Sequence, residues 1–217
     1  MRKRQNGLHN QYKCMLDIEP CAVAAVAAAV YFFDMPALTA LLAAAAVHEL
    51  GHVLCLAALG VHISGFRVET QGLCIEYSGT APAWAHALAA FCGPAAGIAC
   101  AFLFSALSRR FAGGWPALAA GFSLLLSLFN FLPILPLDGG RIMLAAAEGL
   151  FGAARGTRIA SAVSLAAALC ILFAGTLAAC RGLGWGLAAA GCWLIFSSDA
   201  QQSIEKKKKI MFHVKHL

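Results

Sequence analysis

The strongest indication of the fold is the stretch from Pro36 to Gly60, which reads PALTALLAAAAVHELGHVLCLAALG. It is apolar for most of its length, begins at a proline suited to the first turn of a helix and ends at a glycine suited to a helix stop. As a helix it would be about 37 Å long, enough to cross the roughly 30 Å hydrocarbon core of a bilayer. His48, Glu49 and His52 lie inside it. The stretch therefore predicts a membrane-spanning helix with polar chemistry in its interior.

The rest of the chain has the same apolar character. Of its 217 residues, 61% are hydrophobic and 12% are charged, and the mean hydropathy is +0.77. An average globular protein has about twice that share of charged residues, about 25%. This composition excludes an ordinary soluble domain. The net charge of +6 does not indicate a nucleic-acid partner, because the basic residues lie at the two chain ends and in short connections between apolar runs.

Apolar runs predict an all-α polytopic membrane protein with about six transmembrane helices in one domain, residues 1–217. Between the second and third spans, Val61 to Tyr77 alternates apolar and polar residues around Gln71-Gly72, which predicts a small β-hairpin. We expect a catalytic core over about 36–141, C-terminal helices over about 142–197 and a basic tail over 198–217. The expected spans are Cys21 to Phe33, Pro36 to Gly60, Ala83 to Leu107, Trp115 to Leu132, Ile159 to Cys180 and Leu183 to Phe196.

The basic residues also predict an orientation, since Lys and Arg near span ends are retained on the cytoplasmic side. Placing both termini in the cytoplasm leaves only Arg109, Arg110 and Arg181 outside. This orientation puts the hairpin and a polar turn at Asp138 to Arg141 on the cytoplasmic side. We expect a multi-pass protein of the lipid bilayer, in the cell membrane if the chain is bacterial.

His48-Glu49-Leu50-Gly51-His52 is an H-E-x-x-H sequence. On a helix, two histidines four residues apart project from one face, within reach of a single zinc ion. Ionisable side chains inside a membrane span cost several kcal/mol unless they are paired or bound to metal. We therefore expect one zinc ion (Zn2+) per chain. The alternative is that neighbouring backbone or hydroxyl groups satisfy the two histidines.

A hydrolytic zinc site usually has three protein ligands and one open position. The carboxylates near the ends of long spans are Asp34, Asp138 and Asp199. Asp138 is the best placed, because it follows the proline-broken stretch Leu132 to Leu137, whose unwound backbone is tolerated at membrane depth only where it lines a cavity. A solvated turn residue is the alternative interpretation of Asp138. With such a ligand set, Glu49 would act as general base toward the attacking water and as general acid toward the leaving amine.

Two motifs together carry a family resemblance. The H-E-x-x-H span, combined with Asn130 to Arg141 (NFLPILPLDGGR), resembles the site-2 protease family of intramembrane zinc metalloproteases. The second motif fits the family pattern N-x-x-P-x-x-P-L-D-G-G, and Gly93-Pro94-Ala95-Ala96-Gly97 is similar to a small-residue motif of its intervening span. The layout resembles the sporulation stage IV FB-type branch. The resemblance implies zinc ligation by His48, His52 and Asp138, general acid/base catalysis by Glu49, and contact of Asn130 with the substrate backbone.

The expected function is regulated proteolysis of a membrane-anchored protein near the cytoplasmic face. The alternatives are a divalent-metal transporter or channel, in which the same three ligands form a transit site, and an inactive scaffold that binds membrane partners. Substitution of Glu49 separates hydrolysis from transport, because a hydrolase would keep zinc and lose cleavage. The sequence leaves open a homo-oligomer or a regulatory membrane partner.

Overall fold

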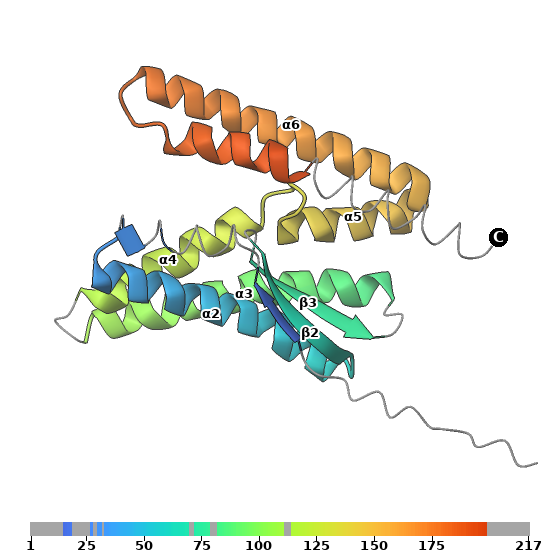
Figure 1. Cartoon of the computed structure of the whole chain (residues 1–217), viewed down its shortest axis with the longest axis horizontal. Coiled ribbons are helices and arrows are strands. Elements are labelled where there is room, and N and C mark those ends of the chain that lie inside the picture. The colour runs from blue at the N-terminus through green and yellow to red at the C-terminus, as the bar shows by residue number, and fades with distance from the viewer. Residues whose placement is uncertain are drawn as a thin grey trace, which may run out of the picture.

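The computed structural model describes residues 15–18, 27, 30–31, 33–69, 72–78, 82–110 and 114–198. Most of the first expected span, Cys21 to Phe33, and the tail from Asp199 onward lie outside these residues. In chain order the elements are β1 (Met15–Ile18), α2 (Met35–Ala58), β2 (His62–Glu69), β3 (Gly72–Ser78), α3 (Ala83–Ser108), α4 (Trp115–Asn130), α5 (Asp138–Phe151), α6 (Ala153–Cys180) and a final helix, Gly186–Ser198 (Figure 1).

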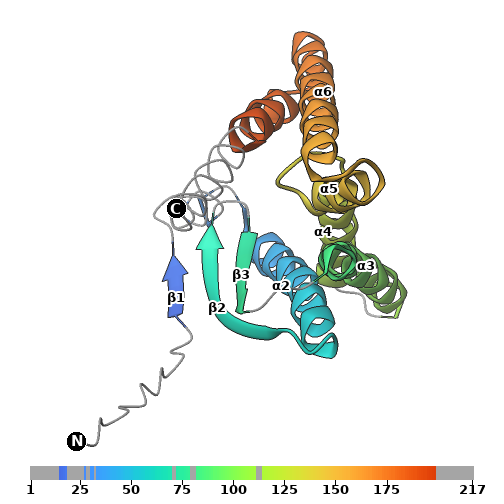
Figure 2. The same cartoon turned by 90° about the vertical axis from the view of Figure 1, so that its right-hand side faces the viewer.

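The helices form two groups with α5 between them. α2, α3 and α4 pack on one another, and α5 contacts both α3 and α6. Viewed nearly along the helices, α2, α3 and α4 lie on one side of α5, and α6 lies on the other (Figure 2). The final helix runs alongside α6 in both views. α5 therefore joins the two groups, and it begins at Asp138.

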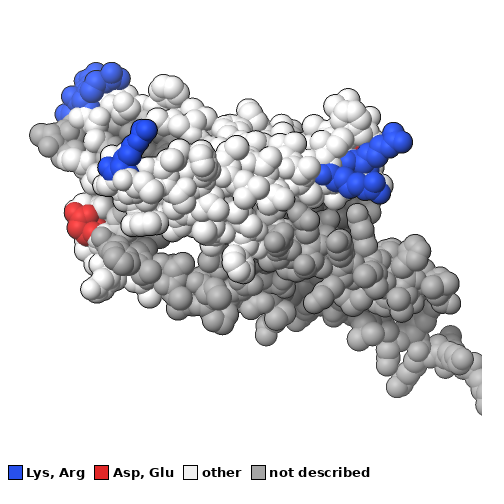
Figure 3. All heavy atoms as spheres, turned by 90° about the horizontal axis from the view of Figure 1, so that it is seen from above, with Lys and Arg blue, Asp and Glu red and all other residues white. Residues whose placement is uncertain are grey.

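Three described helices are long and apolar enough to cross a membrane: Met35–Ala58, Trp84–Ser108 and Ala153–Cys180. Two shorter apolar helices, Trp115–Asn130 and Gly186–Ser198, occupy two more of the expected spans. Lys and Arg side chains lie at the two ends of the described surface, with an uncharged band between them (Figure 3). Large apolar side chains such as Phe102 and Phe173 are exposed. The chain is therefore an integral membrane protein whose apolar surface faces lipid.

The segment between α2 and α3 forms strands. β2 pairs antiparallel with β3 in the region where a hairpin is expected, with Ile63 opposite Tyr77 and Glu69 opposite Gly72. A strand that the sequence did not predict, β1, pairs in parallel with β2, so the sheet has three strands in the order β1-β2-β3. Met15-Leu16-Asp17-Ile18 does not alternate strictly between apolar and polar residues, and its partner strand lies about fifty residues away, so no local pattern indicates β1.

The predicted polar turn at Asp138 to Arg141 is wrong. These residues form the first turn of α5, which continues to Phe151. A carboxylate in the first turn of a helix is favoured by the exposed backbone N–H groups there. The two glycines that suggested a turn lie where a side chain would not fit: a Cβ at Gly139 would meet the carbonyl oxygens of Phe131 and Leu132.

Asp34 has a structural role at the N-terminus of α2. Its Oδ1 accepts a hydrogen bond from the backbone N–H of Ala37, 3.2 Å away, and so caps the helix N-terminus. It lies fourteen residues before His48 in the sequence, about 21 Å along the helix axis. Asp34 is therefore too far away to join His48 as a metal ligand.

We expect Asp34→Ala to lower the free energy of unfolding by about 1 kcal/mol, because it removes this cap. Asp34→Asn, which retains an acceptor oxygen, should be close to the wild type. Denaturant unfolding in detergent micelles measures both. Loss of bound metal in Asp34→Ala would contradict the capping role.

Candidate metal centre

α2 supplies two buried histidines that face the same point. His48 and His52 lie one helical turn apart, with their Nε2 atoms separated by 3.3 Å. Their rings are nearly perpendicular, at 81°. His48 is 4% exposed and His52 is 9% exposed. The helical period alone brings these two rings together, as the H-E-x-x-H spacing predicts.

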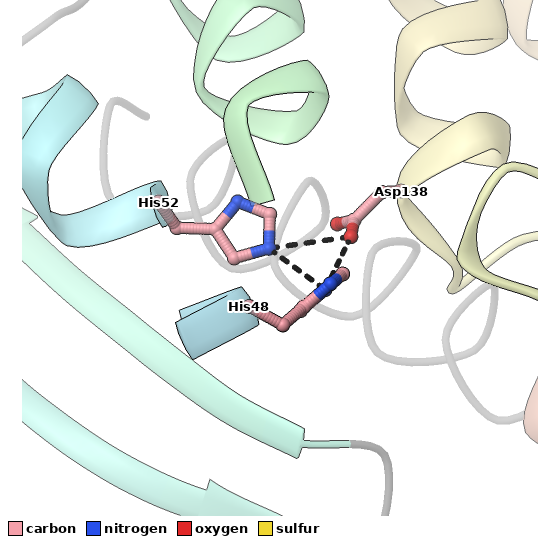
Figure 4. A group of neighbouring side chains, drawn as sticks. All are labelled: His48, His52 and Asp138. Atoms are coloured by element: carbon pink, nitrogen blue, oxygen red, sulfur yellow. Dashed lines mark hydrogen bonds and ion pairs between the residues drawn. The ribbon is translucent and has the colours of Figure 1, made fainter. Parts of the chain in front are cut away.

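Asp138 reaches the same point from the start of α5. Its Oδ2 lies 3.1 Å from His48 Nε2 and 3.2 Å from His52 Nε2. Figure 4 shows the three side chains converging. Asp138 is 5% exposed. Of the three carboxylates considered from the sequence, Asp138 meets the histidines, Asp34 caps α2, and Asp199 lies outside the described residues.

A carbonyl group on α3 orients one of the rings. Nδ1 of His52 lies 2.8 Å from the backbone oxygen of Ala89. A carbonyl oxygen only accepts hydrogen bonds, so Nδ1 carries a hydrogen, and in the neutral imidazole Nε2 then presents a lone pair to Asp138. A histidine that ligates a metal is commonly held in this way through its other ring nitrogen. No pattern in the sequence points to Ala89, because the contact depends on how α3 lies against α2.

Two glycines let α3 approach this closely. A Cβ at Gly51 of α2 would lie 2.6 Å from the carbonyl oxygen of Cys92. A Cβ at Gly93 of α3 would overlap the imidazole ring of His52. Any larger residue at Gly93 must displace either α3 or the ring. The small-residue motif of α3 therefore determines how close the two helices lie at the site.

The geometry suits a zinc ion. His52 Nε2 and Asp138 Oδ2 are both acceptors, and acceptors 3.2 Å apart repel unless a proton or a cation lies between them. Three ligands at 2.0–2.1 Å from a tetrahedral zinc would lie about 3.3 Å apart, close to the separations here. Two imidazoles and a carboxylate are also a usual donor set of hydrolytic zinc sites. Within the described residues, this is the one group of three or more such side chains that could hold a metal.

Arg141 lies next to the carboxylate, although it was not among the predicted site residues. Its Nη1 is 4.0 Å from Asp138 Oδ1, whereas Oδ2 is the oxygen nearest the two histidines. Asp138 also lies in the first turn of α5, where the helix dipole favours a negative charge. Both effects stabilise Asp138 as a carboxylate, the form that binds metal.

The two remaining predicted site residues lie nearby in the fold. Glu49 is half-buried on α2, next to His48. Asn130 is the last residue of α4 and is also half-buried. Its Nδ2 donates to the backbone oxygen of Leu126 in its own helix, at 3.0 Å. The roles of Glu49 and Asn130 stay predictions.

Comparison with known proteins gives the class of this site. Residues 115–174 match the family model described as peptidase family M50. Two curated relatives, each named putative zinc metalloprotease Rip3, come from Mycobacterium tuberculosis strains H37Rv and Erdman. Each is 33% identical over 190 residues, which cover 79% of this chain and 47% of the relative. The chain thus spans about half the length of the curated relatives it matches.

The fold agrees with that class. The site-2 protease from Methanocaldococcus jannaschii superposes with a TM-score of 0.68 at 20% identity, over 85% of this chain and 89% of that one. The chain is thus similar to the site-2 proteases of peptidase family M50, in the matched residues 115–174 and in its fold. Zinc is accordingly the metal assigned to the site of His48, His52 and Asp138.

We expect Gly93→Ala to reduce the zinc content of the purified protein, because the added methyl overlaps the His52 ring, and to destabilise the fold by about 1–3 kcal/mol. Gly121→Ala on α4 is the control, since a Cβ there meets nothing within 4 Å. Metal analysis and denaturant unfolding measure the two effects. Equal zinc content in both variants would contradict the packing described for Gly93.

Proposed function

We propose that this chain is an intramembrane zinc metalloendopeptidase that cleaves a membrane-anchored protein near the cytoplasmic face. The observation that carries the proposal is the triangle of His48 Nε2, His52 Nε2 and Asp138 Oδ2, with sides of 3.1–3.3 Å. Two of its corners lie on a helix long and apolar enough to cross a membrane. Similarity to the site-2 protease family supports the same activity.

His48, His52 and Asp138 would hold one zinc ion per chain. When bound, zinc supplies Lewis-acid chemistry, which makes a water molecule more acidic and polarises a carbonyl group. Three protein ligands leave one tetrahedral position open, the arrangement of hydrolytic rather than structural sites. The Ala89 carbonyl keeps the His52 ring turned toward the ion.

Glu49 would move the proton. Its carboxylate takes a proton from the attacking water as the water oxygen bonds to the scissile carbonyl carbon, and it then gives that proton to the amine nitrogen as the C–N bond breaks. Its place beside His48 on α2 and its partial burial support this role. The H-E-x-x-H sequence is the usual setting for such a base.

The substrate must be extended before it can be cut, because the peptide groups of a helix are already hydrogen-bonded to one another. We propose that Asn130 contacts the substrate backbone and that an exposed strand edge or the broken segment after α4 pairs with the extended substrate. Asn130 lies at the end of α4, where the helix stops and the broken segment toward Asp138 begins. That position supports the assignment.

We propose six spans with both termini, and the sheet, on the cytoplasmic side. The basic residues support this topology, since Arg155 and Arg158 lie at the start of α6, whereas Arg109, Arg110 and Arg181 lie at the far ends of α3 and α6. His48 is about 20 Å from the start of α2 and about 15 Å from its end. The site would therefore lie inside the membrane, nearer the cytoplasmic end.

No observation favours the alternative of a divalent-metal transporter or channel, and the family match gives it no support. A transit site and a hydrolytic site differ in their need for Glu49. Replacing this residue by its amide keeps its size and removes its basicity, so the variant separates the two functions.

We expect Glu49→Gln to retain about one zinc ion per chain and to cleave roughly 10²–10⁴-fold more slowly, because the general base is lost. Asp138→Ala is the matched variant and should lose both zinc and cleavage. Metal content of detergent-purified protein, together with cleavage of co-expressed single-span membrane proteins, measures both. A wild type without zinc, or a Glu49→Gln variant that cleaves normally, would overturn the proposal.

Removal of zinc should also lower stability, since a ligand that binds the folded state at 100 times its Kd stabilises it by about 2.7 kcal/mol. We expect a chelator to lower the unfolding temperature of the wild type and of Glu49→Gln, but not that of His48→Ala. Thermal unfolding with and without chelator tests this. An equal shift in His48→Ala would show that the chelated metal lies elsewhere.

A further inference from the structure

We propose that Ser164, a buried serine of α6, is a positioning residue for the metal centre. It contributes no ligand. Its hydroxyl instead holds the broken segment Phe131–Leu137, which carries the chain from α4 to Asp138. The inference rests on the proposed function in one respect: it takes His48, His52 and Asp138 as the metal ligands.

The backbone hydrogen bonds of this segment point to Ser164. Pro133 and Pro136 have no N–H, so five N–H groups remain between residues 131 and 137. Four of them donate to carbonyl oxygens in α4 or in the segment itself: Phe131 to Ser127, Leu132 to Phe129, Ile134 to Leu132 and Leu137 to Ile134. The fifth, from Leu135, donates to Ser164 Oγ at 2.9 Å. Of the five N–H groups, that of Leu135 alone is satisfied by another element.

The hydroxyl of Ser164 is in turn connected to the end of the chain's last described helix. Ser164 is fully buried, and its Oγ lies 3.4 Å from Ser198 Oγ. Because Ser164 Oγ accepts from Leu135, its own hydrogen is available to Ser198. Ser198 is also buried, with 3% exposed. A chain of contacts thus runs from the broken segment through α6 to the final helix.

Apolar side chains surround these hydrogen bonds of Ser164. Ile134 and Leu137 form a buried cluster with Ala168 of α6 and Leu194 of the final helix. Ala168 and Leu194 each lie four residues, about one helical turn, from Ser164 and Ser198 respectively. In such dry surroundings an N–H without an acceptor costs about 1–3 kcal/mol or more. Without Ser164, the segment would have to move to find another partner.

Such a movement of the segment would also displace Asp138, one of the proposed zinc ligands. Asp138 is three residues after Leu135, and its Oδ2 must stay within a few tenths of an ångström of its place to ligate zinc with the histidines. Groups that orient metal ligands at one remove typically change metal affinity by about 10–100-fold when they are lost. The C-terminal helices would therefore set the metal geometry without touching the metal.

The test is the zinc affinity of the full-length chain in detergent, measured by competition with a chromophoric chelator. We expect Ser164→Ala to bind zinc about 10-fold more weakly than the wild type, or weaker still. Ser164→Cys keeps the volume but is a weak acceptor, so its affinity should lie between the two. The d–d absorption of the cobalt-substituted protein should change in the same order, because it reports the coordination geometry.

Two controls separate positioning from a general loss of stability. Thr176→Val removes a hydroxyl of α6 that donates to the Phe173 carbonyl of its own helix, and it should leave zinc affinity unchanged. Asp34→Ala destabilises the fold far from the site and should also leave zinc affinity unchanged. If Ser164→Ala lowered only the stability of the fold, its zinc affinity would stay at the wild-type value, as is expected for these two controls.

The outcomes are distinguishable. A wild type that binds no zinc would overturn the proposed function itself. Wild-type affinity and an unchanged cobalt spectrum in Ser164→Ala would overturn the role of Ser164 alone. If Ser164→Ala does not yield folded protein, Ser164→Cys decides by the same criterion.

Discussion

The arrangement of the helices centres on the convergence of three atoms that could hold a metal ion inside an apolar helix bundle. His48 Nε2, His52 Nε2 and Asp138 Oδ2 lie 3.1–3.3 Å apart, with the carbonyl of Ala89 fixing the His52 ring. Two atoms that both present lone pairs at this spacing, as neutral His52 and the Asp138 carboxylate do, repel each other unless a cation or a proton lies between them. The other features of the core serve this convergence. The absence of a side chain at Gly93 allows α3 to lie against His52, and α5 begins at Asp138, which supplies the third atom.

Asp138 is the residue whose placement costs the most free energy, because the chain must leave α4 and start α5 within the apolar interior. Unwound backbone at that depth is tolerated only when its polar groups find protein partners. In the segment Phe131–Leu137, four of the five N–H groups donate to nearby carbonyl oxygens. The fifth reaches Ser164 of α6. The two helix groups, which lie on either side of α5 in Figure 2, are thus also joined by a hydrogen bond close to Asp138.

The proposed hydrolytic centre has two further requirements in this setting, and the fold offers backbone partners for the second. Water must reach a site whose ligands are at least nine-tenths buried. An extended substrate must also find backbone partners, because lipid offers none. The sheet beside α2 and the broken segment supply non-helical backbone close to the site.

The sequence by itself determined what depends on local periodicity. The apolar run around H-E-x-x-H specified a long helix with two histidines on one face, since residues four apart always lie together on a helix. The alternating pattern after it predicted the strands β2 and β3. The remaining contacts follow from the tertiary structure alone. It brings Asp138 within 3.2 Å of both histidines, places the Ala89 carbonyl on His52, joins Leu135 to Ser164 and pairs β1 with β2, which lie about fifty residues apart. These contacts join segments whose relative positions follow from helix packing, and no local pattern of residues encodes that packing.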